Sequence, residues 1–307
     1  MRQPVFCLLS VFFSALLLEA AVVQLPLRKQ PIKTADLQER AAFYSKAKAS
    51  FNRHVNPKFA ASNAAKRHRF PMLSYKNDYF VTEVSLGTPP QNFIVAIDEL
   101  EAQFWVLDRS YKGSTLPSQH LYDAEKSTTS QLIDDEYEGI YLEGSALGFT
   151  INDTLQLQGL AYDGQSFGSI QTLSDEFGQW SVDGLFGFGD IGPDEFGEYP
   201  YDNPLYNVAS QLDESTYTLW LSRQNVPQQG FLNGALTLGG FDSAHCDANV
   251  VSQEELFYFF AYVIEVDGIS IGAYSKEQEY LGMVNIGMPF VSLPTAELNV
   301  VQKVGEF

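Results

Sequence analysis

Residues 86–106 read LGTPPQNFIVAIDELEAQFWV, and this stretch decides the fold. The Thr-Pro-Pro at 88–90 predicts a turn, because proline lacks a backbone N–H and biases the preceding residue towards extended geometry. Every position from 93 to 97 is apolar, which predicts a strand buried on both faces. The acidic residue Asp98 ends that strand. Composition alone favours a turn-capping side chain at this position over a functional carboxylate.

The stretch resembles the first active-site segment of pepsin-like aspartic peptidases. In that family Gly-Thr-Pro-Pro-Gln precedes an apolar strand, then Asp-Thr-Gly-Ser, then apolar residues ending in Trp-Val. Here residues 98–101 read DELE where Asp-Thr-Gly-Ser is expected. The resemblance implies that Asp98 is one of two catalytic aspartates that hydrolyse peptide bonds. It implies no cofactor and no metal.

Residues 282–295 read GMVNIGMPFVSLPT and resemble the second active-site segment of the same family, apolar-Asp-Thr-Gly-Thr-Ser. Asn285 occupies the position of the second catalytic aspartate, Ile286 replaces threonine, and Gly287 matches. An amide can donate a hydrogen bond to a carbonyl oxygen but cannot shuttle a proton. The sequence therefore predicts a broken catalytic pair, formed by Asp98 and Asn285.

Two further acids flank Asp98, namely Glu99 and Glu101. Their negative charge is expected to raise the pKa of Asp98. Because both come from the same loop as Asp98, they do not supply the reciprocal geometry of two facing carboxylates. We therefore do not expect either one to replace the second aspartate.

Residues 140–148 read IYLEGSALG and resemble the flap, a β-hairpin that covers the cleft of these peptidases. Tyr141, Gly144 and Ser145 match the flap pattern and are the predicted substrate-binding residues. Leu142 replaces a glycine that is usual in the family, so a hairpin tip with a conformation different from the family's is compatible with the sequence. On its own, Tyr141 is an ordinary strand tyrosine, and the order of the motifs favours the flap.

Three smaller motifs complete the pattern. Asn152-Asp153-Thr154 is an Asn-x-Thr acceptor for glycan, with Asn152 as the candidate glycosylation site, unless it lies too close to a strand. Residues 183–189, DGLFGFG, resemble the family strand that crosses under the first catalytic loop, with a structural role for Asp183. Residues 234–242, GALTLGGFD, match another fold signature.

Charge is distributed unevenly along the 307 residues, whose formal net charge is −19. Residues 21–74 carry eleven Lys/Arg against two acids, a balance of +9. Residues 75–307 carry seven basic residues against 35 acids, a balance of −28. The acidic body excludes nucleic acid as an expected partner. The basic segment predicts either electrostatic docking onto the body or a disordered basic arm.

The motifs divide the chain into four parts. Residues 1–20 read as a signal peptide, and residues 21–74 as a basic prosegment whose Lys66, Arg67 or Arg69 could reach Asp98. Residues 75–250 form an N-terminal β lobe, and residues 251–307 a partial C-terminal β lobe. The predicted fold is all-β and bilobal, with an incomplete C-terminal lobe.

The leader has consequences for location and for the two cysteines. Loss of residues 1–20 would remove Cys7 and leave Cys246 unpaired, most simply as a small buried side chain. We expect a secreted or lumenal protein, lysosomal or extracellular, with no membrane span after processing. We expect a monomer, although two copies could in principle pair their Asp98 lobes.

Three hypotheses about function remain open on the sequence alone. The first is a catalytically impaired homologue that keeps a peptide-binding cleft. The second is an active secreted endopeptidase that works in acid and is made as a zymogen, with its own prosegment and peptides or proteins as partners. The third is a truncated product of a longer peptidase, because the chain ends 22 residues after Asn285.

Overall fold

The computed structural model describes part of the chain. The described residues are 6–11, 68–75, 79–99, 101–113, 115, 119–141, 144–174, 182–189, 202–221, 232–247, 257–258, 262–271, 274–284, 286 and 293–304. Most of the predicted prosegment lies outside them.

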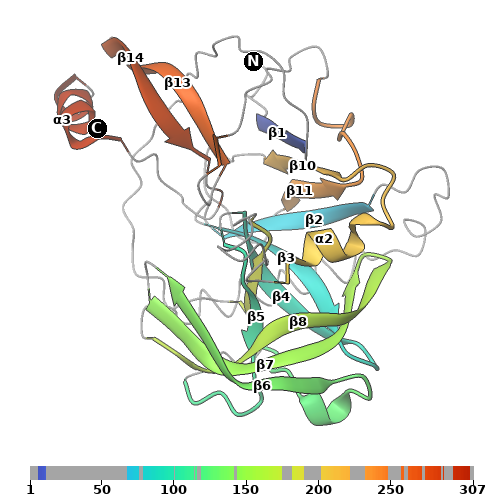
Figure 1. Ribbon diagram of the computed structural model, residues 1–307. Helices are drawn as coiled ribbons and strands as arrows, with labels where there is room; N and C mark the ends of the chain where they lie inside the picture. Colours follow the sequence, from blue (N-terminus) through green and yellow to red (C-terminus); the bar gives the residue numbers. More distant parts are fainter. Residues whose placement is uncertain are drawn as a thin grey trace.

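One sheet of eleven strands dominates the molecule (Figure 1). In spatial order its strands are β1 (Phe6–Val11), β10 (Thr216–Leu221), β11 (Leu232–Leu238), β2 (His68–Tyr75), β3 (Tyr79–Leu86), β4 (Gln91–Asp98), β9 (Gly184–Gly187), β5 (Phe104–Leu107), β8 (Leu160–Leu173), β7 (Gly144–Leu157) and β6 (Gln131–Tyr141). Because β7 also pairs with β3, the strands between them close into a barrel. The all-β prediction is confirmed.

Short helices and a second sheet complete the described structure. They are η1 (Ala124–Lys126), α2 (Pro204–Ala209), the three-stranded sheet of β12 (Phe257–Tyr258), β13 (Tyr262–Ile271) and β14 (Tyr274–Met283), and α3 (Thr295–Val304). Figure 1 shows β13, β14 and α3 at one end, away from β6, β7 and β8. No helix in the described ranges is both long enough and apolar enough to cross a membrane.

Polar side chains connect α3 with β14 through hydrogen bonds. Glu297 of α3 is buried, and its Oε1 accepts hydrogen bonds from the Tyr280 hydroxyl, at 2.6 Å, and from the Lys276 ammonium. The motifs in the sequence did not predict α3. The division at residue 250 and the incompleteness of the second lobe remain predictions.

Strand β4 is buried on both faces, as its unbroken apolar run predicts. Phe93, Val95 and Ile97 point into one hydrophobic core, while Ile94 and Ala96 point into a second core on the opposite face. This arrangement results from the alternation of side chains along a strand. The strand that ends in Asp98 therefore has no freedom to shift its register.

Asp183 fastens β4 to the segment before β9. Its side chain is fully buried, its Oδ2 accepts from the Ile94 N–H at 2.7 Å, and its Oδ1 accepts from the His120 N–H at 2.8 Å. These bonds give Asp183 the structural role expected of it. Farther along, a Cβ at Gly187 would lie 2.3 Å from the Gln103 carbonyl oxygen, so β9 can run under the loop only with glycine there.

The predicted signal and prosegment regions contribute strands to the sheet. Strand β1 lies within residues 1–20 and pairs with β10, and β2 lies between β11 and β3. Arg69 is in β2, opposite Thr237, whereas Lys66 and Arg67 fall outside the described residues. The signal and prosegment assignments remain predictions.

Cys246 is disulfide-bonded in the structure of the full chain. That Cys246 is unpaired once residues 1–20 are removed stays a prediction. The expectation assumed removal of residues 1–20. In the full chain β1 stays in the sheet, with Cys7 opposite Trp220. The Trp220 ring stacks on His245, next to Cys246, with ring centroids 3.8 Å apart.

Substitution of Asp183 tests the attachment of β4. Asp183→Ala leaves the backbone N–H groups of Ile94 and His120 without their acceptor, and each buried group left in this way costs about 1–3 kcal/mol. We expect a loss of about 2–5 kcal/mol in unfolding free energy, measured by urea denaturation. Glu138→Ala, on the exposed face of β6, should change it by less than about 0.5 kcal/mol. Equal effects of both substitutions would contradict the proposed attachment.

Candidate active site

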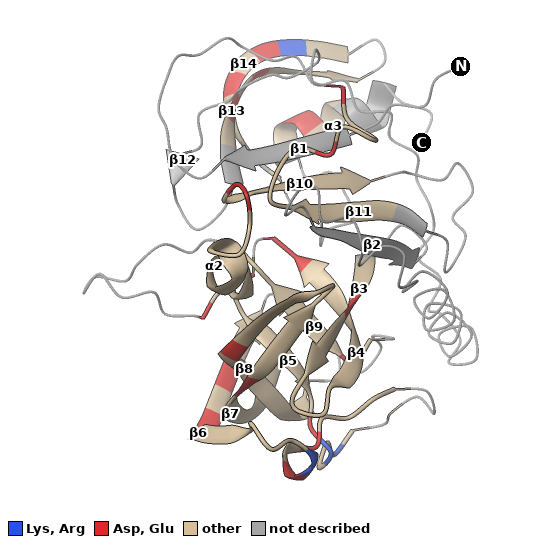
Figure 2. Cartoon of the chain, turned by 90° about the vertical axis from the view of Figure 1, so that its right-hand side faces the viewer, with Lys and Arg blue, Asp and Glu red and all other residues tan. Residues whose placement is uncertain are grey.

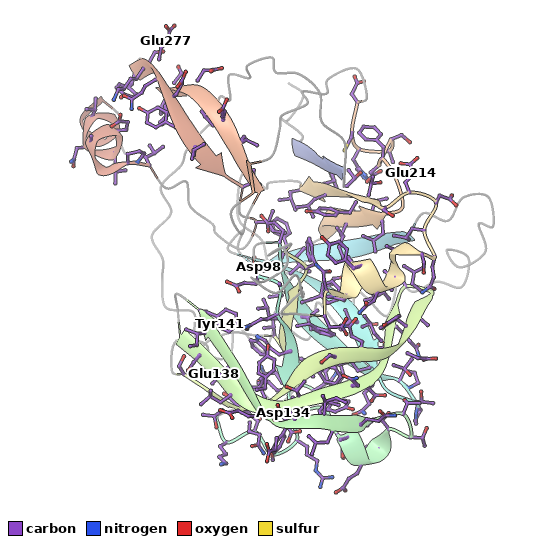
Figure 3. The ribbon with its side chains drawn as sticks, in the orientation of Figure 1. Asp98, Asp134, Glu138, Tyr141, Glu214 and Glu277 are labelled. Atoms are coloured by element: carbon purple, nitrogen blue, oxygen red, sulfur yellow. The ribbon has the colours of Figure 1, made fainter. Side chains whose placement is uncertain are left out.

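Asp98 ends β4 and is partly exposed, near the middle of the molecule (Figure 3). Its Oδ1 accepts from the Glu101 N–H at 3.3 Å, and its backbone carbonyl accepts from the Phe188 N–H at 3.0 Å. The Gly189 N–H donates to the Glu101 carbonyl at 2.9 Å. The loop that carries Asp98 is therefore held by the residues directly after β9.

Glu99 connects this loop to the second active-site-like segment. Its Oε1 accepts from the Ile286 N–H at 2.5 Å, although 187 residues separate the two. Glu99 is 1% exposed, and Ile286, at 9%, belongs to the main hydrophobic core. The structure thus brings the two altered segments together. Asn285 itself lies outside the described residues.

The surroundings of Glu99 disfavour its charged form. Burial raises the pKa of the Glu99 carboxyl well above its ordinary value, and the neighbouring Asp98 carboxylate raises it further. The backbone N–H groups of Glu99 and Ile286 oppose this shift only in part. Oε2 of Glu99 is buried and has no hydrogen-bond partner among the described residues. The surroundings of Glu99 thus favour its neutral form, and its side chain lies inside the protein.

The flap predicted at 140–148 is a hairpin, in which Tyr141 of β6 pairs with Gly144 of β7. The tip residues Leu142 and Glu143 lie outside the described residues. At the other edge of β7, the Ser145 N–H donates to the Ser174 hydroxyl at 3.0 Å, which holds the hairpin to the end of β8. The hairpin expectation is thus confirmed, and contact with substrate remains a prediction.

The Tyr141 side chain points back onto the strand that comes after the Asp98 loop. Its hydroxyl accepts from the Trp105 indole N–H at 2.9 Å and donates to the Gln103 side-chain oxygen. Burial, with a further contribution from Tyr137, raises the pKa of Tyr141, so its hydroxyl stays protonated. Gln103 was not predicted as a partner, because an amide inside the first active-site segment has no distinguishing pattern in the sequence.

The glycan acceptor Asn152 lies inside the sheet. It is opposite Gln131 of β6 and Ser166 of β8, so both edges of β7 are paired at this position. Thr154 is buried, and its hydroxyl donates to Asp163 at 3.0 Å. Glycosylation of Asn152 remains a prediction, and in this fold it would have to precede formation of the sheet.

The described residues hold no group of three or more His, Cys, Asp or Glu side chains that could bind a metal ion together.

The sequence that forms this site matches a known protein family. A family model described as eukaryotic aspartyl protease matches residues 79–306. The chain belongs to this family of pepsin-like aspartic peptidases.

Several curated relatives are similar over most of this chain. Aspartic protease 1 of Caenorhabditis elegans is 27% identical over 298 residues, which cover 92% of this chain and 71% of the relative. Gastricsin of Cavia porcellus is 27% identical over 299 residues, which cover 94% of this chain and 74% of gastricsin. Vacuolar protease A of Aspergillus fumigatus is 27% identical over 247 residues, which cover 78% of this chain and 60% of that protease. The matches thus span between 60% and 74% of the length of these relatives.

Removal of one oxygen atom tests the flap contact. Tyr141→Phe leaves the Trp105 indole N–H and the Gln103 side-chain oxygen without their shared partner. We expect a loss of about 1–3 kcal/mol in unfolding free energy, measured by urea denaturation. The matched control is Tyr162→Phe, because Tyr162 packs at the edge of the core and its hydroxyl makes no hydrogen bond within the described part of the chain. The control should be nearly neutral, and an equally neutral Tyr141→Phe would show that these hydrogen bonds do not stabilise the flap.

Proposed function

We propose that this protein is a pepsin-family homologue that binds peptides between Asp98 and the flap and hydrolyses them poorly or not at all. The observation that carries the proposal is the hydrogen bond between the Glu99 carboxyl and the Ile286 N–H. This bond supports docking of the second segment at the first loop. The residue that precedes Ile286 is asparagine, so one acid rather than two is available to the reaction.

The chemistry of the family explains why one acid is insufficient. Aspartic peptidases use two carboxylates that share one proton. One takes a proton from the attacking water, and the other polarises the scissile carbonyl. Asp98 can act as the base, but an amide at position 285 cannot return a proton. General acid–base catalysis contributes about 10²–10⁴-fold, so its loss should cost a comparable factor.

Peptide binding does not need the second acid. The hydroxyl of Tyr141 is held by Trp105 and Gln103, and this arrangement fixes one wall of the candidate cleft beside the Asp98 loop. Hydrogen-bond donors and acceptors near Asp98 can recognise a peptide backbone whether or not hydrolysis occurs. The ligand class that we propose is therefore an extended peptide or an unfolded protein segment.

An active endopeptidase is the second candidate function. It is favoured by family membership and by the intact hydrogen bonds of the flap, and it requires that Asp98 alone supports turnover. The matches to two of the relatives span 71% and 60% of the length of those relatives. Binding, turnover and the folded state of the chain at neutral pH separate these alternatives.

Maturation and location belong to the same proposal. We infer that residues 1–20 direct the chain to a secreted or lumenal compartment and that residues 21–74 act as a basic prosegment. The balance of +9 for residues 21–74 against −28 for residues 75–307 supports this inference. Figure 2 shows acidic residues at many places on the described body, and basic residues near η1 and on β14. The name of one relative places that relative in the vacuole.

The first test measures binding and turnover together. At about pH 4, close to the ordinary carboxyl pKa values, a peptide mixture should stabilise the wild-type protein against heat without being cleaved, as followed by mass spectrometry. Asp98→Ala should weaken this stabilisation, because it removes the acid that faces the peptide. Cleavage by wild type that disappears in Asp98→Ala would instead establish the endopeptidase. A full-length chain that is unfolded at neutral pH would favour the truncated product.

Restoring the missing groups gives a complementary prediction. Asn285→Asp combined with Glu99→Thr reintroduces a second carboxylate and the hydroxyl expected beside Asp98. We expect peptide cleavage to rise by about 10²-fold or more over wild type. Glu99→Thr alone is the control and should not raise cleavage, because the second acid is still missing. No gain in the double variant would mean that the loss of activity has a cause other than the missing acid.

The basic prosegment gives a prediction about pH and salt. Because carboxylates of the acidic body become neutral in acid, residues 21–74 should become more sensitive to an added protease between about pH 5 and pH 3. High salt at neutral pH should have the same effect, since it screens exposed charges. Protease sensitivity that changes with neither pH nor salt would contradict docking of the prosegment on the body.

A further inference from the structure

The two positions at which the family resemblance calls for threonine contact each other directly. They are Glu99 in the first segment and Ile286 in the second, and the Glu99 Oε1 lies 2.5 Å from the Ile286 nitrogen. A threonine hydroxyl can both accept and donate a hydrogen bond. An ionised carboxylate can only accept, whereas a neutral carboxylic acid can do both. The protonation state of Glu99 therefore decides what this contact can do.

The burial of Glu99 favours the neutral acid at this contact. The side chain is 1% exposed, Oε1 accepts from Ile286, and Oε2 has no partner among the described residues. The backbone N–H groups of Glu99 and Ile286 favour the ionised form. They compensate only in part for a buried negative charge, because no cation pairs with Glu99 among the described residues. A proton on Oε2 removes that charge and leaves Oε1 free to accept.

We propose that Glu99 is a positioning residue, which as a neutral carboxylic acid fastens the segment around Ile286 to the Asp98 loop and on ionisation releases it. The contact is then a pH-dependent clasp between the two active-site-like segments. The proposal concerns the joint between the segments and does not depend on whether the protein cleaves peptides.

The groups around Glu99 reinforce this behaviour. Asp98, at the end of β4, is the charged group that acts on Glu99 in the described part of the chain, and it opposes ionisation. Glu101 is a third acid on the same loop, and its backbone N–H donates a hydrogen bond to Asp98 Oδ1. After β9, the residues Phe188 and Gly189 that hold the loop carry no charge, and in the second segment neither do Val284 and Ile286.

Linkage gives the sign of the pH effect. The folded protein holds Glu99 protonated to a higher pH than the unfolded chain, whose carboxyl titrates near its ordinary pKa of 4.5. Between those two values the unfolded state binds fewer protons, so stability falls as pH rises. The contribution of the clasp to stability is therefore fully present below about pH 4.5 and is lost as the pH rises through the raised pKa of the folded protein.

Hydrogen–deuterium exchange on the full chain tests the proposal. The measured quantity is the protection of the backbone amides in a peptide that covers residues 282–287, at about pH 4 and at pH 7.5. Glu99→Gln keeps the shape and the acceptor but cannot ionise. Both proteins share the same intrinsic exchange chemistry at each pH. The ratio of amide protection in wild type to that in Glu99→Gln therefore reports the clasp alone. We expect equal protection of the two proteins at about pH 4, and about tenfold less protection in wild type than in Glu99→Gln at pH 7.5.

Two further variants separate a clasp from a passive structural role. Glu99→Ala should lose protection at both pH values. Asp98→Asn removes the neighbouring charge that opposes ionisation, so release should begin at a lower pH than in wild type. If Glu99→Ala does not fold, the comparison of wild type with Glu99→Gln still shows whether the clasp depends on ionisation of Glu99. A wild-type to Glu99→Gln ratio that is the same at both pH values, or low protection of Glu99→Gln at both, would overturn the proposal.

Discussion

The burial of β4 on both faces is the constraint on which the rest of the structure depends. Its side chains fill two cores, its edges pair with β3 and β9, and Asp183 holds its backbone at Ile94. A strand fixed in this way can neither slide nor rotate. The position and direction of its last residue, Asp98, are therefore fixed, and the chain turns into the next loop at that point.

This constraint also explains how an acid comes to lie inside the protein. The loop after Asp98 is held by the N–H groups of Phe188 and Gly189, so the position after Asp98 faces the interior. Glu99 fits there by reaching the Ile286 N–H, and burial together with the Asp98 charge raises its pKa and favours its neutral form. The altered loop is thus accommodated without an unpaired buried charge.

The two halves of the candidate site have diverged to different extents from the family pattern. The flap side has its tyrosine in place, bonded to Trp105 and Gln103. The acid side has one aspartate, a buried glutamic acid and an asparagine at position 285. Recognition of a peptide relies mainly on shape and hydrogen bonds, whereas hydrolysis relies on a shared proton between two acids. A protein can lose the second property and keep the first, which is the basis of the proposed function.

The sequence by itself determined the elements whose signals are local. The apolar run before Asp98 predicted a doubly buried strand, the hairpin at Tyr141 and Gly144 was recognisable, and Asp183 had its structural role. Tertiary structure alone decided the contact of Glu99 with Ile286, the pairing of β1 with β10, the disulfide of Cys246, and the contact of α3 with β14. Each of these depends on segments far apart in the chain, and no periodicity or spacing within one segment records which distant segment will pack against it.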